Sequence, residues 1–276
     1  MDKDELLKRA RDPKYIPGIY NYCDRWCERC RFTSRCLNCD LVEEQFGNLE
    51  EKDEINETFW EMFSEMLQTT MSMVKEMAKE AGIDIDAVDI DQDDDSDAFK
   101  ENSLADLISH TSKNYGKSVD DWFDANDFLF YEKEDEMNRI HLISSQHNPE
   151  KEAADINDAT EVVRWYQHLI HVKLNRAIRS ASEEESMDNE DFPKDSDGSA
   201  KVALIGIDRS ISAWNMLLDY FPEQTTQILN FIALLENIKS RAEIRFPGAR
   251  DFVRPGFDEI EPIFDYSNSD TDLPSG

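Results

Sequence analysis

The sequence predicts an all-α fold: a helical bundle of four or more long amphipathic helices with an N-terminal Cys-rich metal-binding segment. Several long stretches repeat their apolar residues with the helical period of 3.6, and none alternates like a strand. Nine Gly and nine Pro are few for 276 residues. This scarcity argues against a many-turned β-sandwich and against a glycine-fingerprinted nucleotide-binding fold.

The first two predicted helices flank the cysteine segment. Residues 1–14 are a short charged helix, and Pro17–Gly18 forms a turn after it. A long helix follows at about 50–81 and ends at Gly82. Its apolar stripe predicts a face packed in the core and consists of Phe59, Met62, Phe63, Met66, Met73, Val74 and Met77.

Five further helices are predicted in the second half of the chain. They cover 99–113, an aromatic-rich stretch at 120–131, then 159–180, 200–221 and 224–246. Residues 140–143 are expected in an irregular connection. Pro222 suits the first turn of the last helix.

One domain is expected, with three parts. Residues 1–47 form the Cys-rich segment packed on the bundle, and residues 48–260 form the bundle. Acidic linkers are predicted at 84–97 and 183–199. Residues 261–276 are expected to be a disordered tail.

The net charge of −31 excludes some partners. Nucleic acid and anionic membrane surfaces would be repelled, so we expect neither as a partner, while a protein partner stays open. No stretch has the roughly 18–20 apolar residues of a membrane span. The charged start MDKDELLKRARD is no secretory signal. These features predict a cytoplasmic protein, in which clustered Cys stays reduced and is typically metal-binding.

All five cysteines lie within seventeen residues, with the spacing C-x3-C-x2-C-x5-C-x2-C. This clustering predicts metal ligation, rather than buried thiols or a redox-active dithiol. On a helical wheel Cys23, Cys27 and Cys30 share one face, so we expect them, together with Cys36, to be the ligand set. Cys39 is then spare.

Two metals fit this pattern. Along a straight helix Cys23 and Cys30 are about 10 Å apart, whereas one zinc needs sulfurs roughly 4 Å apart. An iron–sulfur cluster tolerates wider separation and is therefore favoured over structural zinc. The alternative is a pair of zinc knuckles, C27-x2-C30 and C36-x2-C39, with a short spacer between them.

Charged and aromatic residues crowd the same segment. Nearby guanidinium groups would offset the negative charge of a thiolate centre, or would instead pair with surface carboxylates. These groups belong to Arg25, Arg29, Arg31 and Arg35. Aromatic rings would shield the centre from solvent: Tyr22, Trp26 and Phe32.

Three stretches resemble an uncharacterised family of bacterial proteins. They are IPGIYNYCDRWCERC with FTSRC near the N-terminus, SDGSAKVALIGIDRSISAW, and FPGARDFVRPGFDEI. The resemblance covers roughly 100 residues, implies a shared fold, and carries over no functional residue.

The predicted function is a metal-binding protein without catalysis of its own, engaged in electron transfer or in scaffolding a partner. The alternative is a helical-bundle metal-dependent oxidoreductase with a carboxylate or His site. His168 and His171 point away from the apolar face of their helix, which predicts a surface or interhelical role. Lys173 lies at the centre of that face. If buried, it needs a carboxylate partner, for which Asp208 is a candidate.

Overall fold

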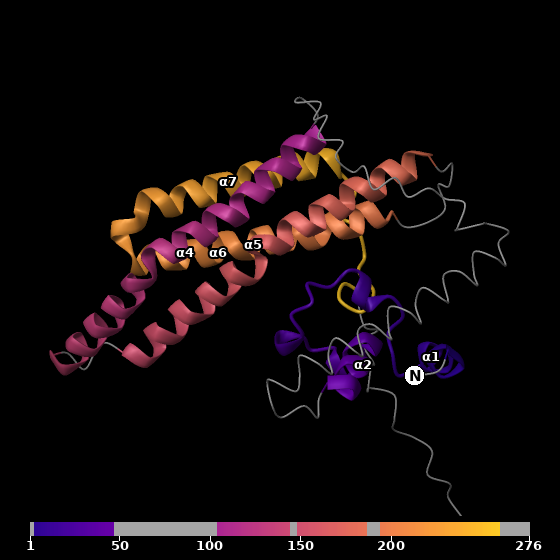
Figure 1. Ribbon diagram of the computed structural model, residues 1–276, viewed down its shortest axis with the longest axis horizontal. Coiled ribbons are helices and arrows are strands. Elements are labelled where there is room, and N and C mark those ends of the chain that lie inside the picture. Colours follow the sequence, from indigo (N-terminus) through magenta and orange to yellow (C-terminus); the bar gives the residue numbers. More distant parts are fainter. Residues whose placement is uncertain (1–2, 47–103, 144–147, 187–193, 260–276) are drawn as a thin grey trace, which may run out of the picture.

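Four long helices form the body of the molecule (Figure 1). They are α4 (Leu104–Ile143), α5 (Pro149–Ser186), α6 (Asp195–Tyr220) and α7 (Thr225–Arg245). Two short helices precede them, α1 (Lys3–Ala10) and α2 (Leu37–Phe46). The computed structural model describes residues 3–46, 104–143, 148–186 and 194–259, and within these ranges it contains no strand. The predicted all-α bundle is confirmed.

The four long helices close into a bundle in chain order. α5 packs on both α4 and α6, and α7 packs on both α6 and α4. α4 has 40 residues and α6 has 26, so their lengths are about 60 Å and about 39 Å at 1.5 Å per residue. Because of this difference, the end of α4 and the start of α5 project beyond the other two helices (Figure 1).

Aromatic side chains fill the middle of the bundle. The rings of Trp214 and Phe231 stack with centroids 4.8 Å apart, and Trp122 meets Trp214 edge-on at 5.2 Å. The indole N–H of Trp214 donates a hydrogen bond of 3.0 Å to the hydroxyl of Tyr115. Large buried rings whose polar atoms are paired provide much of the apolar burial that stabilises such a core.

α4 corrects one prediction. Residues 99–113, 120–131 and 140–143 were expected as two helices and a connection, but 104–143 is one continuous helix. Gly116 sits in its middle, where a Cβ atom would lie 2.9 Å from the main-chain oxygen of Gln167. Glycine at this position therefore allows α4 to pack closely on α5. The stability gained from this packing outweighs the low helix propensity of glycine.

The boundaries around the second acidic stretch also differ from prediction. α5 starts at Pro149, about ten residues before the expected start, and α6 starts at Asp195. Most of the predicted linker 183–199 is therefore helical. The long helix predicted at 50–81, the acidic stretch 84–97 and the tail 261–276 lie outside the described residues.

Candidate metal centre

The cysteine segment folds as a series of tight turns. The 3-10 turns Ile19–Asn21, Cys27–Arg29 and Thr33–Arg35 alternate with irregular backbone. Between the first two turns, a carboxylate oxygen of Asp24 accepts the backbone N–H of Trp26 at 3.3 Å, and Arg25 has the left-handed φ of 59°. Both features compete with an α-helix. The expected helical face that would unite the first three cysteines is therefore wrong.

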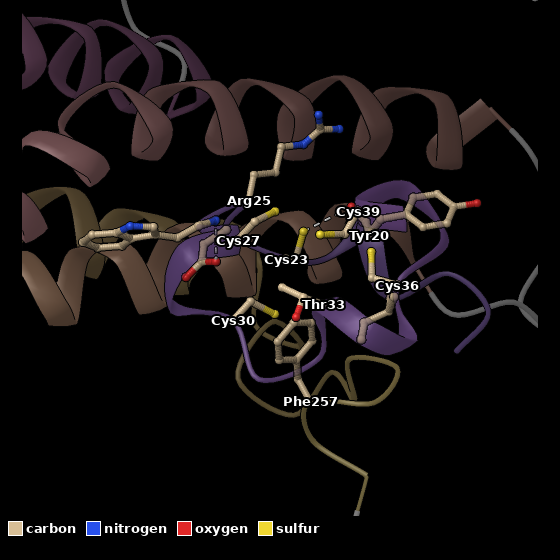
Figure 2. A pocket seen from close by; sticks show the side chains of 12 residues that line it. Tyr20, Cys23, Arg25, Cys27, Cys30, Thr33, Cys36, Cys39 and Phe257 are labelled. Carbon is tan, nitrogen blue, oxygen red and sulfur yellow. Dashed lines mark hydrogen bonds between the residues drawn. The ribbon is translucent and has the colours of Figure 1, made fainter. Parts of the chain in front are cut away.

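All five cysteines nevertheless line one pocket, which Figure 2 shows from close by. Cys27 is exposed, and the other four are partly buried. The pocket wall is completed by apolar, polar and charged residues: Ile19, Tyr20, Asp24, Arg25, Trp26, Thr33 and Phe257. The turns thus bring together thiols that a straight helix would have kept apart.

Each C-x2-C pair forms its own turn. In the first pair, the backbone N–H of Cys30 donates to the carbonyl of Cys27 at 3.1 Å. In the second pair, Cys36 precedes α2, and its carbonyl accepts the N–H of Asp40 at 3.1 Å. Cys39 lies in the first turn of α2, where the unpaired backbone N–H groups favour negative charge.

One sulfur accepts a backbone N–H group from the residue two positions further on. Phe32 donates to Cys30 Sγ at 3.4 Å, whereas the thiol of Cys23 itself donates to the carbonyl oxygen of Tyr20 at 3.5 Å. Hydrogen bonds donated to a sulfur stabilise its thiolate form, which is the form that binds metals.

Burial favours the protonated form of three thiols of this pocket. Burial, with Cys39 and other thiols nearby, raises the pKa of Cys27 to about 11. Burial also raises the pKa values of Cys23 and Cys39. A metal ion entering the pocket must therefore displace protons, which makes its binding stronger as the pH rises.

The sulfurs do not yet form a finished coordination site. Among the described residues, no three His, Cys, Asp or Glu side chains are close enough together to hold a metal ion. The thiols of Cys27 and Cys39 lie close enough to each other to influence each other's pKa. Ligation would therefore require the turns to close further around the pocket.

These observations bear on the predicted ligands. Cys23, Cys27, Cys30 and Cys36 all line the pocket, but so does Cys39, which was expected to be spare. The choice of four among five stays a prediction. Cys23 and Cys30 do not lie on a straight helix, so the separation of about 10 Å expected from one does not count against zinc.

Asp24 joins the cysteine segment to the bundle. Its main-chain oxygen accepts the indole N–H of Trp165 at 3.0 Å. Its carboxylate accepts the hydroxyl of Tyr166 at 2.6 Å and the guanidinium of Arg209 at 2.8 Å. The residue thus bonds to both α5 and α6. The sequence carried no sign of this role, because the partners lie over 140 positions away.

Aromatic contacts strengthen the same attachment. Trp26 is buried and stacks on Trp165 with ring centroids 4.9 Å apart. Phe32 is buried too and meets Phe257 edge-on at 5.1 Å. Tyr22 donates a hydrogen bond of 3.0 Å to Asp195. All three rings predicted to shield the centre therefore serve in packing, and Trp26 also lines the pocket.

One arginine of the segment pairs with surface carboxylates as predicted, and the role of offsetting a thiolate centre stays a prediction. Arg29 forms ion pairs with Asp158 and Glu161 on α5, at 2.6 and 2.5 Å. Arg25 lines the pocket. Arg31 lies over the ring of Phe32.

Lys173 is buried, but the partner predicted for it is wrong. Asp208 forms ion pairs with Lys239 at 3.0 Å and with Arg250 at 2.7 Å. Burial lowers the pKa of Lys173, and Cys23 is the nearby group that acts most strongly against this effect. The sequence located this lysine correctly on the buried face of its helix.

The two histidines of α5 bridge to α4. His168 lies 3.0 Å from a carboxylate oxygen of Asp120. His171 is hydrogen-bonded to Ser112 at 2.9 Å and to Asn175 at 3.0 Å. This agrees with the interhelical role predicted for them.

Comparisons with known proteins add nothing to what the structure indicates about function. No protein-family model, no curated protein and no solved structure shows a significant match to this chain. None of the helices among the described residues is both long and apolar enough to cross a membrane.

Proposed function

We propose that the five-cysteine pocket binds a metal as a cysteine-ligated centre, and that this centre holds the N-terminal segment in shape against the bundle. One observation carries the proposal. Thiols from two 3-10 turns, from the bend that precedes them and from the first turn of α2 line a single pocket. The N–H group of Phe32 directed at Cys30 supports it, because such a hydrogen bond favours a thiolate.

A metal would supply stability that this segment otherwise lacks. The large apolar side chains that it buries are Tyr15, Ile19, Trp26 and Phe32. So small a core rarely orders a short segment of turns by itself, and structural metal sites commonly make up the difference. The proposed function is therefore that of a metal-bound scaffold, whose order depends on the centre.

Both predicted metals remain compatible with the pocket. Structural zinc takes four thiolates in a tetrahedron, and the two C-x2-C turns suit it. An iron–sulfur cluster also takes four thiolates, and it would add electron transfer to the scaffold role. Either choice leaves one of the five thiols without a metal bond.

The first test is chemical analysis of the full chain. The protein is purified without oxygen, and its visible spectrum and its iron, sulfide and zinc contents are measured. Matched iron and sulfide with a broad visible band support the cluster, and near-stoichiometric zinc in a colourless protein supports structural zinc. Neither metal, with five freely titrating thiols, contradicts the proposal.

Single substitutions then assign the ligands. Cys36 and Cys39 lie three positions apart in one turn, so the variants Cys36→Ser and Cys39→Ser serve as matched controls for each other. Loss of metal in Cys36→Ser alone supports the set Cys23, Cys27, Cys30 and Cys36. Loss in Cys39→Ser alone shows that this set is wrong, and loss in both variants with retention in Cys23→Ser supports the two knuckles.

In the part of the chain that the structure describes, no observation favours the oxidoreductase alternative. Among the described residues, the buried polar and charged side chains are Ser112, Asn126, Gln167, Lys173, Ser196, Ser199 and Ser210. A carboxylate-bridged centre in a bundle needs Glu, Asp or His projecting into the core.

A further inference from the structure

The cysteine pocket is completed by the opposite end of the described chain. All the residues that line it come from positions 19–39 except Phe257, which follows α7. The chain after α7 runs back to the N-terminal segment (Figure 1), and the ring of Phe257 points toward Thr33 in the pocket wall (Figure 2). That ring meets Phe32 edge-on, with centroids 5.1 Å apart. One side of the pocket is therefore closed only while this ring stays in place.

The C-terminal segment 246–259 is held at two separate places. Close to α7, the guanidinium of Arg250 pairs with one carboxylate on α6 and one on α7, at 2.7 and 2.8 Å. Closer to Phe257, Lys201 of α6 binds Asp258 at 3.0 Å and donates a hydrogen bond of 2.5 Å to the main-chain oxygen of Phe252. Residues 252–258 thus have an anchor of their own, and they can leave the pocket while the contacts next to α7 remain.

Two glycines allow residues 252–258 to lie close against the cysteine segment. Gly256 has a left-handed φ of 75°, and a Cβ atom there would lie 2.9 Å from Ile16 and 3.1 Å from Ile19. On the facing side Gly18 also has a left-handed φ, of 73°, and its Cβ position lies 4.0 Å from Pro255. The contact is close but small. Segments held by small contact surfaces open at a lower free energy than the whole protein unfolds.

We propose that residues 252–258 are a movable cover of the cysteine pocket, whose opening controls how fast metal enters and leaves. The cover itself follows from the contacts above, whereas its control of the metal rests on the proposed function. While the cover is closed, Phe257 shields the thiols from water and from competing ligands. Lys201 stabilises the closed position, because it holds both Asp258 and the main chain of the cover.

The test compares Phe257→Ala and Gly256→Ala with Val253→Ala in the full chain. Phe257→Ala removes the ring, and Gly256→Ala pushes the cover away from Ile16 and strains its backbone. Val253 lies in the same cover, is 59 % exposed and does not line the pocket, so it is the matched control. Two rates are measured: metal release from the loaded protein to a chelator, and alkylation of each thiol by iodoacetamide in the metal-free protein, followed by mass spectrometry.

We expect Phe257→Ala and Gly256→Ala to release metal about tenfold faster than wild type, because losing one close contact shifts the balance between closed and open cover. Alkylation of Cys30 and Cys36, which flank Thr33 in the sequence and are partly buried, should accelerate by a similar factor. Cys27 is exposed already and should react at the wild-type rate. Val253→Ala should match wild type in both assays.

Lys201→Met provides an independent test, should either variant fail to fold. It removes the anchor of the cover and leaves the residues of the cover and of the pocket unchanged. It should accelerate the same two rates. Lys194→Met, which changes an exposed lysine at the start of the same helix, is its control and should leave both rates unchanged.

Two results would overturn the inference, and they are distinguishable. If the wild type holds metal and the three cover variants release it at the wild-type rate, the cover is refuted while the proposed function stands. If the wild type holds neither zinc nor iron, the proposed function fails, and alkylation then decides about the cover. Unchanged rates at Cys30 and Cys36 refute the cover as well, and faster rates in the variants support a cover over free thiols.

Discussion

Asp24 shows how much of the tertiary structure can depend on a single side chain. Its main-chain oxygen and its carboxylate bind three donors, Trp165, Tyr166 and Arg209, from two helices. It is also the residue after Cys23, so a movement of the loop that changes the pocket must also strain these bonds. Hydrogen bonds to a charged acceptor are the stronger ones, which makes Asp24 the firmest polar link between the segment and the bundle.

Gly116 provides a prediction at the same scale. In an exposed helix interior Gly→Ala stabilises by roughly 0.5–1 kcal/mol. Here a Cβ would lie 2.8 Å from a ring nitrogen of His168 and 2.9 Å from a main-chain oxygen of α5. We expect Gly116→Ala to destabilise the protein by about 1–3 kcal/mol, measured by denaturant unfolding.

Lys117→Ala is the matched control for this change. The side chain of Lys117 is next in sequence and exposed, and alanine has the better helix propensity there. We expect its effect to stay within about 0.5 kcal/mol of wild type. An equally neutral Gly116→Ala would show that α4 and α5 do not pack as closely as described.

At the scale of elements, the cysteine segment and α5 are joined along one side of the helix. Arg29 binds Asp158 and Glu161, and one turn further on Trp165 stacks on Trp26. The ion pairs are largely exposed and contribute little, typically below 1 kcal/mol. The buried aromatic pair therefore carries more of the attachment.

Trp165→Ala tests this attachment. The change removes the stacking surface for Trp26 and the hydrogen bond to the main chain of Asp24. We expect faster amide hydrogen exchange across residues 15–46 and faster metal release, while α6 and α7 keep their protection. Hydrogen exchange with mass spectrometry and a chelator assay measure the two effects.

Tyr131→Ala removes an aromatic ring that is 67 % exposed on α4, and it serves as the control. It should leave both exchange in residues 15–46 and metal release unchanged. If Trp165→Ala behaves in the same way, the segment is held by contacts other than this stack.

At the scale of the whole molecule, the two ends of the described chain meet. Phe257 lines the cysteine pocket and packs on Phe32. The next residue, Asp258, binds Lys201 on α6 at 3.0 Å and Arg254 at 2.9 Å. The C-terminal segment 246–259 thereby connects the pocket to the bundle.

The ion pairs of Asp258 predict that the stability of the protein depends on pH. Burial opposes ionisation of Asp258, but hydrogen bonds from Arg254 and Lys201 outweigh it and hold the pKa of its carboxyl well below the usual range. A depressed pKa gives stability that is present above the unfolded value of about 4 and is lost as the pH falls below it. We expect Asp258→Asn to lower stability at neutral pH, with the difference from wild type shrinking below about pH 4.

Thermal unfolding at a series of pH values measures this difference. Asp251→Asn is the matched control, because that side chain lies in the same segment, is exposed and forms no ion pair among the described residues. It should follow the wild-type profile. If the difference in stability between Asp258→Asn and wild type stays unchanged down to pH 2, the ionisation of Asp258 does not contribute to stability as expected.

The sequence by itself determined the fold class, the buried face of α5 with Lys173 on it, and the cysteine cluster. These follow from periodicity and spacing, which are local properties of the chain. The sequence did not predict α4 as one continuous helix, because the place of Gly116 inside a helix depends on α5 lying against it. It also assigned a helix to the cysteine segment, where Asp24 and Arg25 instead form a turn.

Only the tertiary structure decided how the candidate centre is built. It placed all five thiols around one pocket and paired Asp208 with Lys239 and Arg250 instead of Lys173. These pairings join positions far apart in the chain, such as Asp24 with Arg209. Residue spacing reports on neighbours within a few turns. Partners that folding brings together from distant positions are selected by packing and charge in three dimensions.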